Sequence, residues 1–189
     1  FGLFKKVEKG VVKSITLNVV DMSASEYNVV GSLAGMIEDS EIYSVHVAGK
    51  AERVLGNNLV GGVAGYVLGN SRINDISTDI RVTAVYSSAN AQETLLYNRD
   101  IYKWNELGNK YNNITQLAYA GGAFGVVDLE PFANTKPSVY YVDDVLCSNI
   151  VSKVENSIVG SVVGGIVGCV GMNTTLSHSH MVVSPETKL

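Results

Sequence analysis

The nine residues 59–67 read "LVGGVAGYV", an uncharged phrase of glycine and apolar side chains. Similar phrases stand at 29–37 ("VVGSLAGMI"), 119–127 ("YAGGAFGVV") and 162–170 ("VVGGIVGCV"). When one phrase recurs along a single chain, the chain is usually assembled from repeated structural units. A repeat architecture is therefore the first hypothesis for the fold.

The spacing of the phrases is regular in the N-terminal part of the chain. A shift of 30 residues aligns 3–17 with 33–47 without a gap, and it also carries Gly31 onto Gly61. The phrase then returns after 60 residues (61 to 121) and after 43 more (121 to 164). Periods of about 20–50 residues are typical of solenoids and related arrays.

Within each repeat the apolar residues follow the period of a β-strand. In "SITLNVV" (14–20), Ile15, Leu17 and Val19 alternate with other residues, and "ISTDIRVTAVY" (76–86) alternates in the same way. Strict alternation indicates strands with one buried face. We therefore expect an all-β chain folded as a parallel β-helix (β-solenoid), with coils of about 30 residues and a short helical insertion.

Composition limits the classes of partner. The 189 residues are 46% hydrophobic, enough for a single domain spanning 1–189, and the net charge of −4 favours no nucleic-acid partner. The apolar run 158–172 has 15 residues, five of them glycine, whereas a membrane-spanning helix needs about 20 apolar residues. We expect a monomer without membrane insertion. The sequence opens in the middle of the repeat pattern with "FGLF", so we expect it to be a fragment of a longer chain.

Glycine has a structural role in this hypothesis. It adopts positive φ without steric strain at turns between short strands, and it lets neighbouring backbones approach closely. A phosphate-binding loop is disfavoured, because "GGVAGYVLG" lacks the lysine that such a loop requires. The glycines assigned to structural turns are Gly31, Gly35, Gly61, Gly62, Gly65, Gly121, Gly122, Gly125, Gly164, Gly165 and Gly168.

The order of these phrases resembles a known repeat family. The stretch "GLFKKVEKGVVKSITLNVV" (2–20) is followed by "NVVGSLAGMIEDSEIYSVHVAGKAERVLGNNLVGGVAGYV" (28–67). Together they resemble the GLUG-type repeats of bacterial surface proteins, and in particular the N-terminal β-helical region of the immunoglobulin A1-specific zinc metallopeptidases. Residues 160–172 match the same pattern again, whereas 87–160 match it poorly.

The resemblance implies a localisation and a role. It implies a secreted or cell-surface bacterial protein in which this fragment is a non-catalytic recognition or spacer domain. Its partner would be a host protein, such as immunoglobulin A1, or a glycan. No cofactor is expected in this fragment, and the zinc would be held elsewhere in the parent chain.

The histidines give no sequence signature of a zinc enzyme. The motif H-E-x-x-H is absent, and His46, His178 and His180 are the only histidines. Alternation places His46 opposite Val45, facing solvent. His178 and His180 would share one face of a strand and could hold a metal, but no third ligand is visible, so solvated histidines are the favoured interpretation.

Carboxylates raise the alternative of a polysaccharide-active enzyme. Asp75 and Asp79 lie near a repeat strand, and a second acidic pair stands at 143–144. Paired carboxylates can act as general acid and base. Acidic residues on an exposed face are also what solubility requires, and we favour that interpretation. The cluster of Glu38, Asp39 and Glu41 is interpreted as a solvated turn.

Cys147 and Cys169 are the only cysteines. They lie 22 residues apart (147 to 169), about one coil, so they could stack and form a disulfide in an oxidising compartment. A buried free thiol at Cys169 is the other interpretation.

One segment, 88–118, breaks the repeat. A capping box at Asn90 and Glu93 and apolar residues at helical spacing predict a helix over about 91–107. Its apolar stripe could simply cover the flank of the solenoid, or the insertion could carry a binding site. A second excursion is expected at 128–144. The candidate binding residues are Tyr97, Arg99, Tyr102, Trp104 and Tyr111.

Three classes of function remain open. The first is a recognition or spacer domain of a secreted metallopeptidase, and this fragment itself is then no enzyme. The second is an adhesin stalk that binds a host protein or glycan. The third is a polysaccharide-active β-helix.

Overall fold

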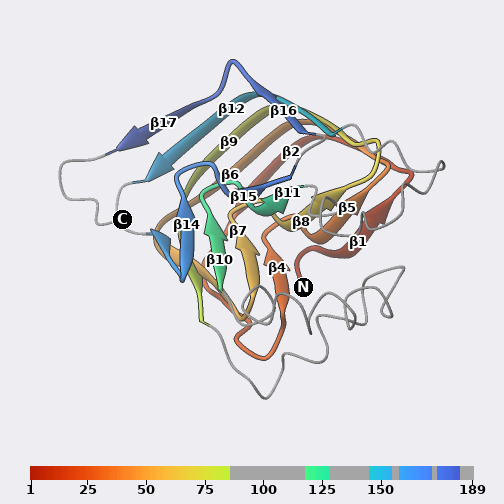
Figure 1. Cartoon of the computed structure of the whole chain (residues 1–189). Coiled ribbons are helices and arrows are strands. Elements are labelled where there is room, and N and C mark those ends of the chain that lie inside the picture. The colour runs from red at the N-terminus through yellow and green to blue at the C-terminus, as the bar shows by residue number, and fades with distance from the viewer. Residues whose placement is uncertain (86–117, 128–144, 155–157, 172–173, 184–189) are drawn as a thin grey trace.

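The computed structural model describes residues 1–85, 118–127, 145–154, 158–171 and 174–183 (Figure 1). These residues form strands and no helix, and every strand pair in them is parallel. The predicted all-β class is therefore confirmed for this part of the chain. The helix expected over 91–107 and the excursion at 128–144 lie outside the described residues.

The strands form three sheets, which we call A, B and C. Sheet A runs in the order β1 (Phe4–Glu8), β5 (Ala34–Glu38), β8 (Ala64–Leu68), β11 (Phe124–Val127) and β15 (Val167–Val170). Sheet C runs in the order β4 (Val29–Gly31), β7 (Leu59–Gly61), β10 (Tyr119–Gly121) and β14 (Val162–Gly164).

Sheet B is the longest of the three, with eight strands. Its main path is β2 (Val11–Asn18), β6 (Glu41–Gly56), β9 (Arg72–Ala84), β12 (Val145–Val154) and β16 (Thr174–Ser177). Three short strands extend it: β3 (Met22–Ser23) beside β6, β13 (Ile158–Val159) beside β9, and β17 (His180–Val183) beside β12.

The chain visits the sheets in the same order each time. It passes from sheet C to sheet A and then to sheet B, and it returns to sheet C beside the strand it left there (Figure 1). We call one such passage a level. Phe4 pairs with Ala34 and Ala34 with Ala64, so neighbouring levels follow the 30-residue shift seen in the sequence. Such stacked parallel sheets are compatible with the predicted β-helix.

The longer sequence intervals do not disturb this register. Gly61 pairs with Gly31 on one side and with Gly121 on the other, and Gly121 pairs in turn with Gly164. At four successive levels, the residues paired with one another in sheet C are therefore the same glycine of the repeated phrase.

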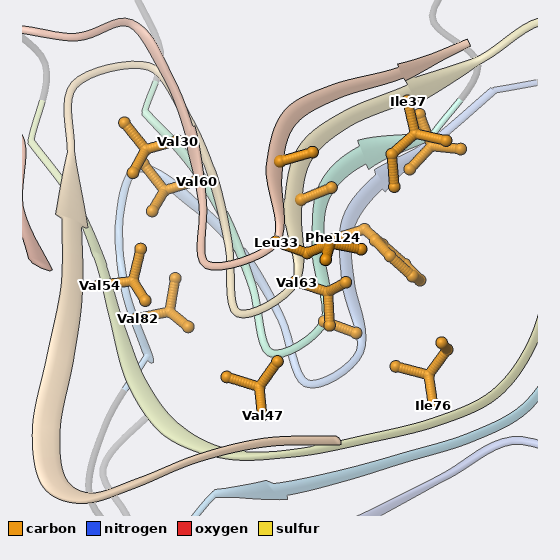
Figure 2. Close-up of a cluster of buried hydrophobic side chains, with 14 of the residues drawn as sticks. Val30, Leu33, Ile37, Val47, Val54, Val60, Val63, Ile76, Val82 and Phe124 are labelled. Atoms are coloured by element: carbon orange, nitrogen blue, oxygen red, sulfur yellow. The ribbon is translucent and has the colours of Figure 1, made fainter. Parts of the chain in front are cut away.

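The main core lies between the sheets and is built from the inward residues of all three. Figure 2 shows Val30, Leu33 and Ile37 directed into the same enclosed space as Val47 and Ile76 of sheet B. The alternation predicted for β9 is confirmed. The side chains of its inward positions are all buried: Ile73, Ile76, Thr78, Ile80, Val82 and Ala84.

A bend interrupts the alternation at an equivalent position of β2, β6, β9 and β12, and directly after β16. Ile42 and Val45 are both buried, so two consecutive residues between them, Tyr43 and Ser44, face outward. Ser44 has a φ of 51°, in the left-handed region. The equivalent residues at the other levels also have positive φ: Ser14, Asp75, Asn149 and His178.

The repeated glycines lie at or beside the sharp turn from sheet C to sheet A. A β-carbon on Gly65 would lie 2.5 Å from the carbonyl oxygen of Leu59 and 2.7 Å from the backbone nitrogen of Val30. Among the described glycines, only Gly69 has a positive φ. The expectation of positive φ in the phrase is therefore wrong, and close backbone approach explains these glycines instead.

The same turn creates a second apolar cluster. It is so sharp that the outer sides of sheets A and C face one another, and their side chains form a cluster separate from the main core. Simple alternation would have placed these residues in solvent. The buried members are Val29, Met36, Tyr66, Leu68, Tyr119 and Val126.

Candidate functional site

The outer face of sheet B carries polar side chains at many of its positions. Its strands pair in register, so outward residues of successive levels form columns. Three neighbouring columns make up what we call the polar face. They are Lys13, Tyr43, Asn74, Ser148 and Ser177; then Ser14, Ser44, Asp75, Asn149 and His178; then Thr16, His46, Ser77, Val151 and His180.

Hydrogen bonds join neighbouring levels across the polar face. The hydroxyl of Ser44 donates to Oδ2 of Asp75 at 2.6 Å. Nδ2 of Asn149 donates to Oδ1 of Asn74 at 2.7 Å, and the hydroxyl of Ser148 donates to the same oxygen at 3.0 Å. Exposed hydrogen bonds add little to stability, but they restrict the orientation of the groups that they join. The polar face is therefore partly preorganised.

All three histidines are exposed on the polar face. The prediction that His46 faces solvent is confirmed, and its Nδ1 lies 2.8 Å from the hydroxyl oxygen of Ser77. His178 occupies the bend between β16 and β17, and His180 follows in the next column. Within the described residues, no three histidine, cysteine or carboxylate side chains group closely enough to hold a metal.

The candidate carboxylates of β9 lie on the same surface. Asp75 is exposed and accepts the hydrogen bond from Ser44, while Asp79 is half-buried two columns away. The pair at 143–144 lies outside the described residues. Both carboxylates of β9 therefore lie on the outer side of sheet B.

The solvated-turn interpretation is wrong for Glu38. Its side chain is buried, and its carboxylate forms an ion pair with Nζ of Lys6 at 2.6 Å. Burial by itself would lower the pKa of Lys6, but hydrogen bonds to Glu38 and Glu8 raise it overall. The reason is geometric. In sheet A, Lys6 and Glu8 of β1 pair directly with Met36 and Glu38 of β5, which brings the ammonium group beside the buried carboxylate.

Two arginines that the sequence analysis did not consider lie side by side in sheet B. Arg53 of β6 pairs in register with Arg81 of β9, and both point outward because Val54 and Val82 beside them are buried. Nε of Arg81 is buried without a hydrogen-bond partner among the described residues. Like charges opposite each other on neighbouring strands repel, and an anionic group bound between the two guanidinium groups would relieve this repulsion. The 28-residue interval (53 to 81) hides this pair from a search at a fixed 30-residue shift.

Both cysteines are free thiols, so the disulfide interpretation is wrong for this structure. Cys147 belongs to sheet B and points into the main core, whereas Cys169 belongs to sheet A and contacts the second cluster. Burial raises the pKa of the Cys147 thiol to about 12. A thiol with so high a pKa is a poor nucleophile at neutral pH.

The candidate binding residues of the insertion, Tyr97, Arg99, Tyr102, Trp104 and Tyr111, lie outside the described residues. Comparison of the chain with family models, with curated proteins and with solved structures gives no match. The resemblance to GLUG-type repeats therefore depends on the sequence phrases alone. In the described part of the chain, no helix is long and apolar enough to cross a bilayer. The apolar run beginning at 158 forms β13, β14 and β15 instead.

Proposed function

We propose that the chain is a β-solenoid recognition or spacer domain, with coils of about 30 residues, that does not itself catalyse a reaction. The stacked levels support the solenoid architecture, because each level passes through sheets C, A and B in the same order. The resemblance of 2–20 and 28–67 to GLUG-type repeats supports a secreted or cell-surface bacterial protein. The favoured parent is an immunoglobulin A1-type zinc metallopeptidase, with zinc and catalysis elsewhere in that chain.

The polar face is the observation that carries the recognition role. Its columns repeat hydroxyl, amide and imidazole groups at the inter-strand distance of about 4.8 Å. Hydrogen bonds between Ser44 and Asp75, and between Asn149 and Asn74, hold members of these columns in place. An array of ordered polar groups suits an extended polar ligand, such as a glycan or an exposed strand of a host protein, lying across several levels.

A second candidate function, an adhesin stalk that binds glycans, is favoured by Arg53 and Arg81. Two guanidinium groups at adjacent rungs can bind a carboxylate or sulfate by charge-assisted hydrogen bonds. An acidic host glycan would then extend from this pair onto the polar face, since both surfaces belong to the outer side of sheet B.

The experiment measures binding of the 189-residue chain to immobilised immunoglobulin A1 and to neutral and acidic host glycans. Asn74→Ala removes the acceptor shared by Ser148 and Asn149, so we expect weaker binding of the ligand that uses the polar face. Arg53→Gln should weaken only acidic ligands and reduce the salt dependence of their binding. Asn70→Ala is the control, because Asn70 is exposed at the turn before sheet B. Undiminished binding by folded Asn74→Ala and Arg53→Gln would reject the recognition surface and favour a spacer.

A further inference from the structure

Four side chains at the boundary between two neighbouring levels stand together on the outer side of sheet B. Glu41 and Tyr43 of β6 pair in register with Arg72 and Asn74 of β9. All four point outward, because the residue between the two in each strand is buried in the main core. Their backbone positions form a rectangle of about 4.8 by 6.6 Å, set by the strand spacing and by the rise of two residues along a strand. We call these four residues the tyrosine cluster.

Tyr43 gives the cluster an aromatic surface. Among the outward residues that the structure describes in sheet B, it is the only tyrosine, phenylalanine or tryptophan. Its column holds Lys13, Ser148 and Ser177 at other levels. Tyr43 is half-buried, so part of its side chain is accessible to a ligand. A tyrosine ring offers a rigid apolar face beside a polar hydroxyl group.

The amide of Asn74 is held in one orientation beside Tyr43. Its Oδ1 accepts hydrogen bonds from the Ser148 hydroxyl at 3.0 Å and from Nδ2 of Asn149 at 2.7 Å. Both donors belong to β12, on the side of β9 that is opposite to β6. The oxygen and the nitrogen lie at different edges of the amide plane, so Nδ2 and its two N–H donors are turned away from β12.

Glu41 and Arg72 add an acceptor and a donor at the adjoining rung. Both are exposed, and their opposite charges cancel. Partial desolvation, and next the carboxylate of Glu41, raise the pKa of the Tyr43 hydroxyl, whereas Arg72 lowers it, so the three groups lie close together. The cluster therefore combines an aromatic ring, a carboxylate, a guanidinium and an amide, and it has no net charge.

The position of the cluster within the sheet limits the kind of ligand. β6 and β9 have strands on both sides, because β2 lies next to β6 and β12 lies next to β9. Their backbone groups are used in these pairings, so a peptide strand has no open edge to join here. A ligand at this place meets side chains alone.

We propose that the tyrosine cluster binds one ring of a neutral sugar, stacked on Tyr43 and hydrogen-bonded by the other three side chains. The C–H face of a pyranose is apolar, and its hydroxyl groups both donate and accept hydrogen bonds. The tyrosine ring suits the apolar face, while the carboxylate accepts from the hydroxyl groups and the guanidinium and amide donate to them. The zero net charge favours an uncharged sugar over an acidic one. The inference rests on the proposed recognition function and names the ligand class of that surface.

The test measures binding of the 189-residue chain to immobilised neutral oligosaccharides that end in galactose, mannose or N-acetylglucosamine. Tyr43→Ser should weaken binding about tenfold or more, whereas Tyr43→Phe keeps the ring and should bind within about threefold of wild type. The fold should accept the serine, because Ser148 and Ser177 already occupy the same column. Arg72→Thr should also weaken binding, and Thr175 stands in its column.

Ser177→Ala is the matched control, because Ser177 lies in the column of Tyr43 but two strands beyond Asn74. It should bind as wild type does. If the serine variant at Tyr43 does not fold, nuclear magnetic resonance of the wild-type chain decides the question. The C–H protons of the bound sugar should shift upfield in the ring current of the tyrosine, and unshifted protons would contradict the stacking.

The possible failures separate this inference from the recognition function. Equal sugar binding by wild type and folded Tyr43→Ser would overturn the tyrosine cluster as a sugar site. If Asn149→Ala still weakens binding in that case, the polar face keeps its recognition role without the cluster. A wild-type chain that binds immunoglobulin A1 but none of the sugars would also overturn the inference and leave recognition intact. A folded chain that binds neither would overturn both.

Discussion

The sulfur atom of Met181 occupies the position that a β-carbon on Gly165 would fill. The same complementarity recurs across the core at other levels. The hydroxyl of Ser152 overlaps the position of a β-carbon on Gly122. The methyl group of Thr78 lies 3.3 Å from the position of a β-carbon on Gly62. At Gly165 a side chain of sheet B therefore leaves room only for glycine, whereas at Gly62 and Gly122 a backbone oxygen of the neighbouring level also lies too close for a β-carbon.

Gly165→Ala should destabilise the fold by about 1–3 kcal/mol, as overpacking of a core does. The three nearest atoms at this position all belong to the flexible side chain of Met181, so Met181→Ala should restore most of the loss in the double variant. At Gly122 the carbonyl oxygen of Gly165 also clashes with a new β-carbon. Because this backbone atom remains, Ser152→Ala should not rescue Gly122→Ala. Denaturant unfolding of the four single variants and the two double variants measures both couplings. Equal coupling in the two pairs would contradict this explanation.

Gly65→Val should be more damaging, with a loss of about 3 kcal/mol or more in the free energy of unfolding. Its new β-carbon would meet backbone atoms of Leu59 and Val30, which cannot move without opening the turn. Gly10→Ala is the matched control, because the nearest atom there is 3.3 Å away in the side chain of Val7. Thermal unfolding reports both variants. An unchanged melting temperature for Gly65→Val would show that the close approach is not required.

Lys6→Met should destabilise the chain more than Glu38→Gln. The first leaves the buried carboxylate of Glu38 without its cation, whereas the second leaves Lys6, which is one-third exposed, paired with Glu8. Glu8→Gln is the control, since that carboxylate is 46% exposed and its loss should change stability by less than about 1 kcal/mol. Equal effects of all three substitutions in denaturant unfolding would argue against a structural role for the buried pair.

Cys147 should make stability fall at alkaline pH. The thiol titrates near 9.0 when the chain is unfolded and near 12 when it is folded. The unfolded state therefore releases its proton first, so the stabilisation is complete below pH 9.0 and is lost between the two values. Cys147→Val should show a flatter decline when unfolding is measured across this range. A thiol reagent should modify half-buried Cys169 in the native chain and Cys147 only after unfolding. Rapid native modification of Cys147 would refute its burial.

Replacement of 88–118 by a short Gly/Ser linker should leave the strand signal in circular dichroism intact and weaken binding to the biological partner. The segment concentrates aromatic residues and Arg99, types that are enriched in binding hot spots. If the segment only covers the flank, its removal should instead lower the melting temperature or cause aggregation. Undiminished affinity of the folded deletion variant would count against a binding role for Tyr97 and Trp104.

Direct comparison of the sequence with itself predicted the strand register correctly. The 30-residue shift aligned Val12 with Ile42 and Leu17 with Val47, and these residues are paired in sheet B. This succeeded because stacked strands place equivalent residues side by side, so selection for similar size at each rung leaves a visible repeat in the sequence.

Features that depend on distant segments were not predicted. Glu38 was placed in solvent because nothing near it in the chain suggests a partner, and Lys6 reaches it only through the pairing of sheet A. The second cluster was missed although a signal existed: β8 is apolar on both of its sides, with Val67 in the main core and Tyr66 in the cluster. The spacing of three residues from Ile42 to Val45 likewise marks the bend in sheet B.

The registered pairing also determines how the chain would respond to mechanical tension. The hydrogen bonds that join neighbouring levels point along the stacking direction, and among the described strands the outermost ones have a neighbour on one side only. A pull on the two chain ends would peel a terminal level away bond by bond, while the inner levels bear the same force in intact sheets. A level of 30 residues, such as the one that begins at Val29 and ends before Leu59, would release roughly 100 Å of extended chain. A protein held under tension through this chain would therefore lengthen in discrete steps.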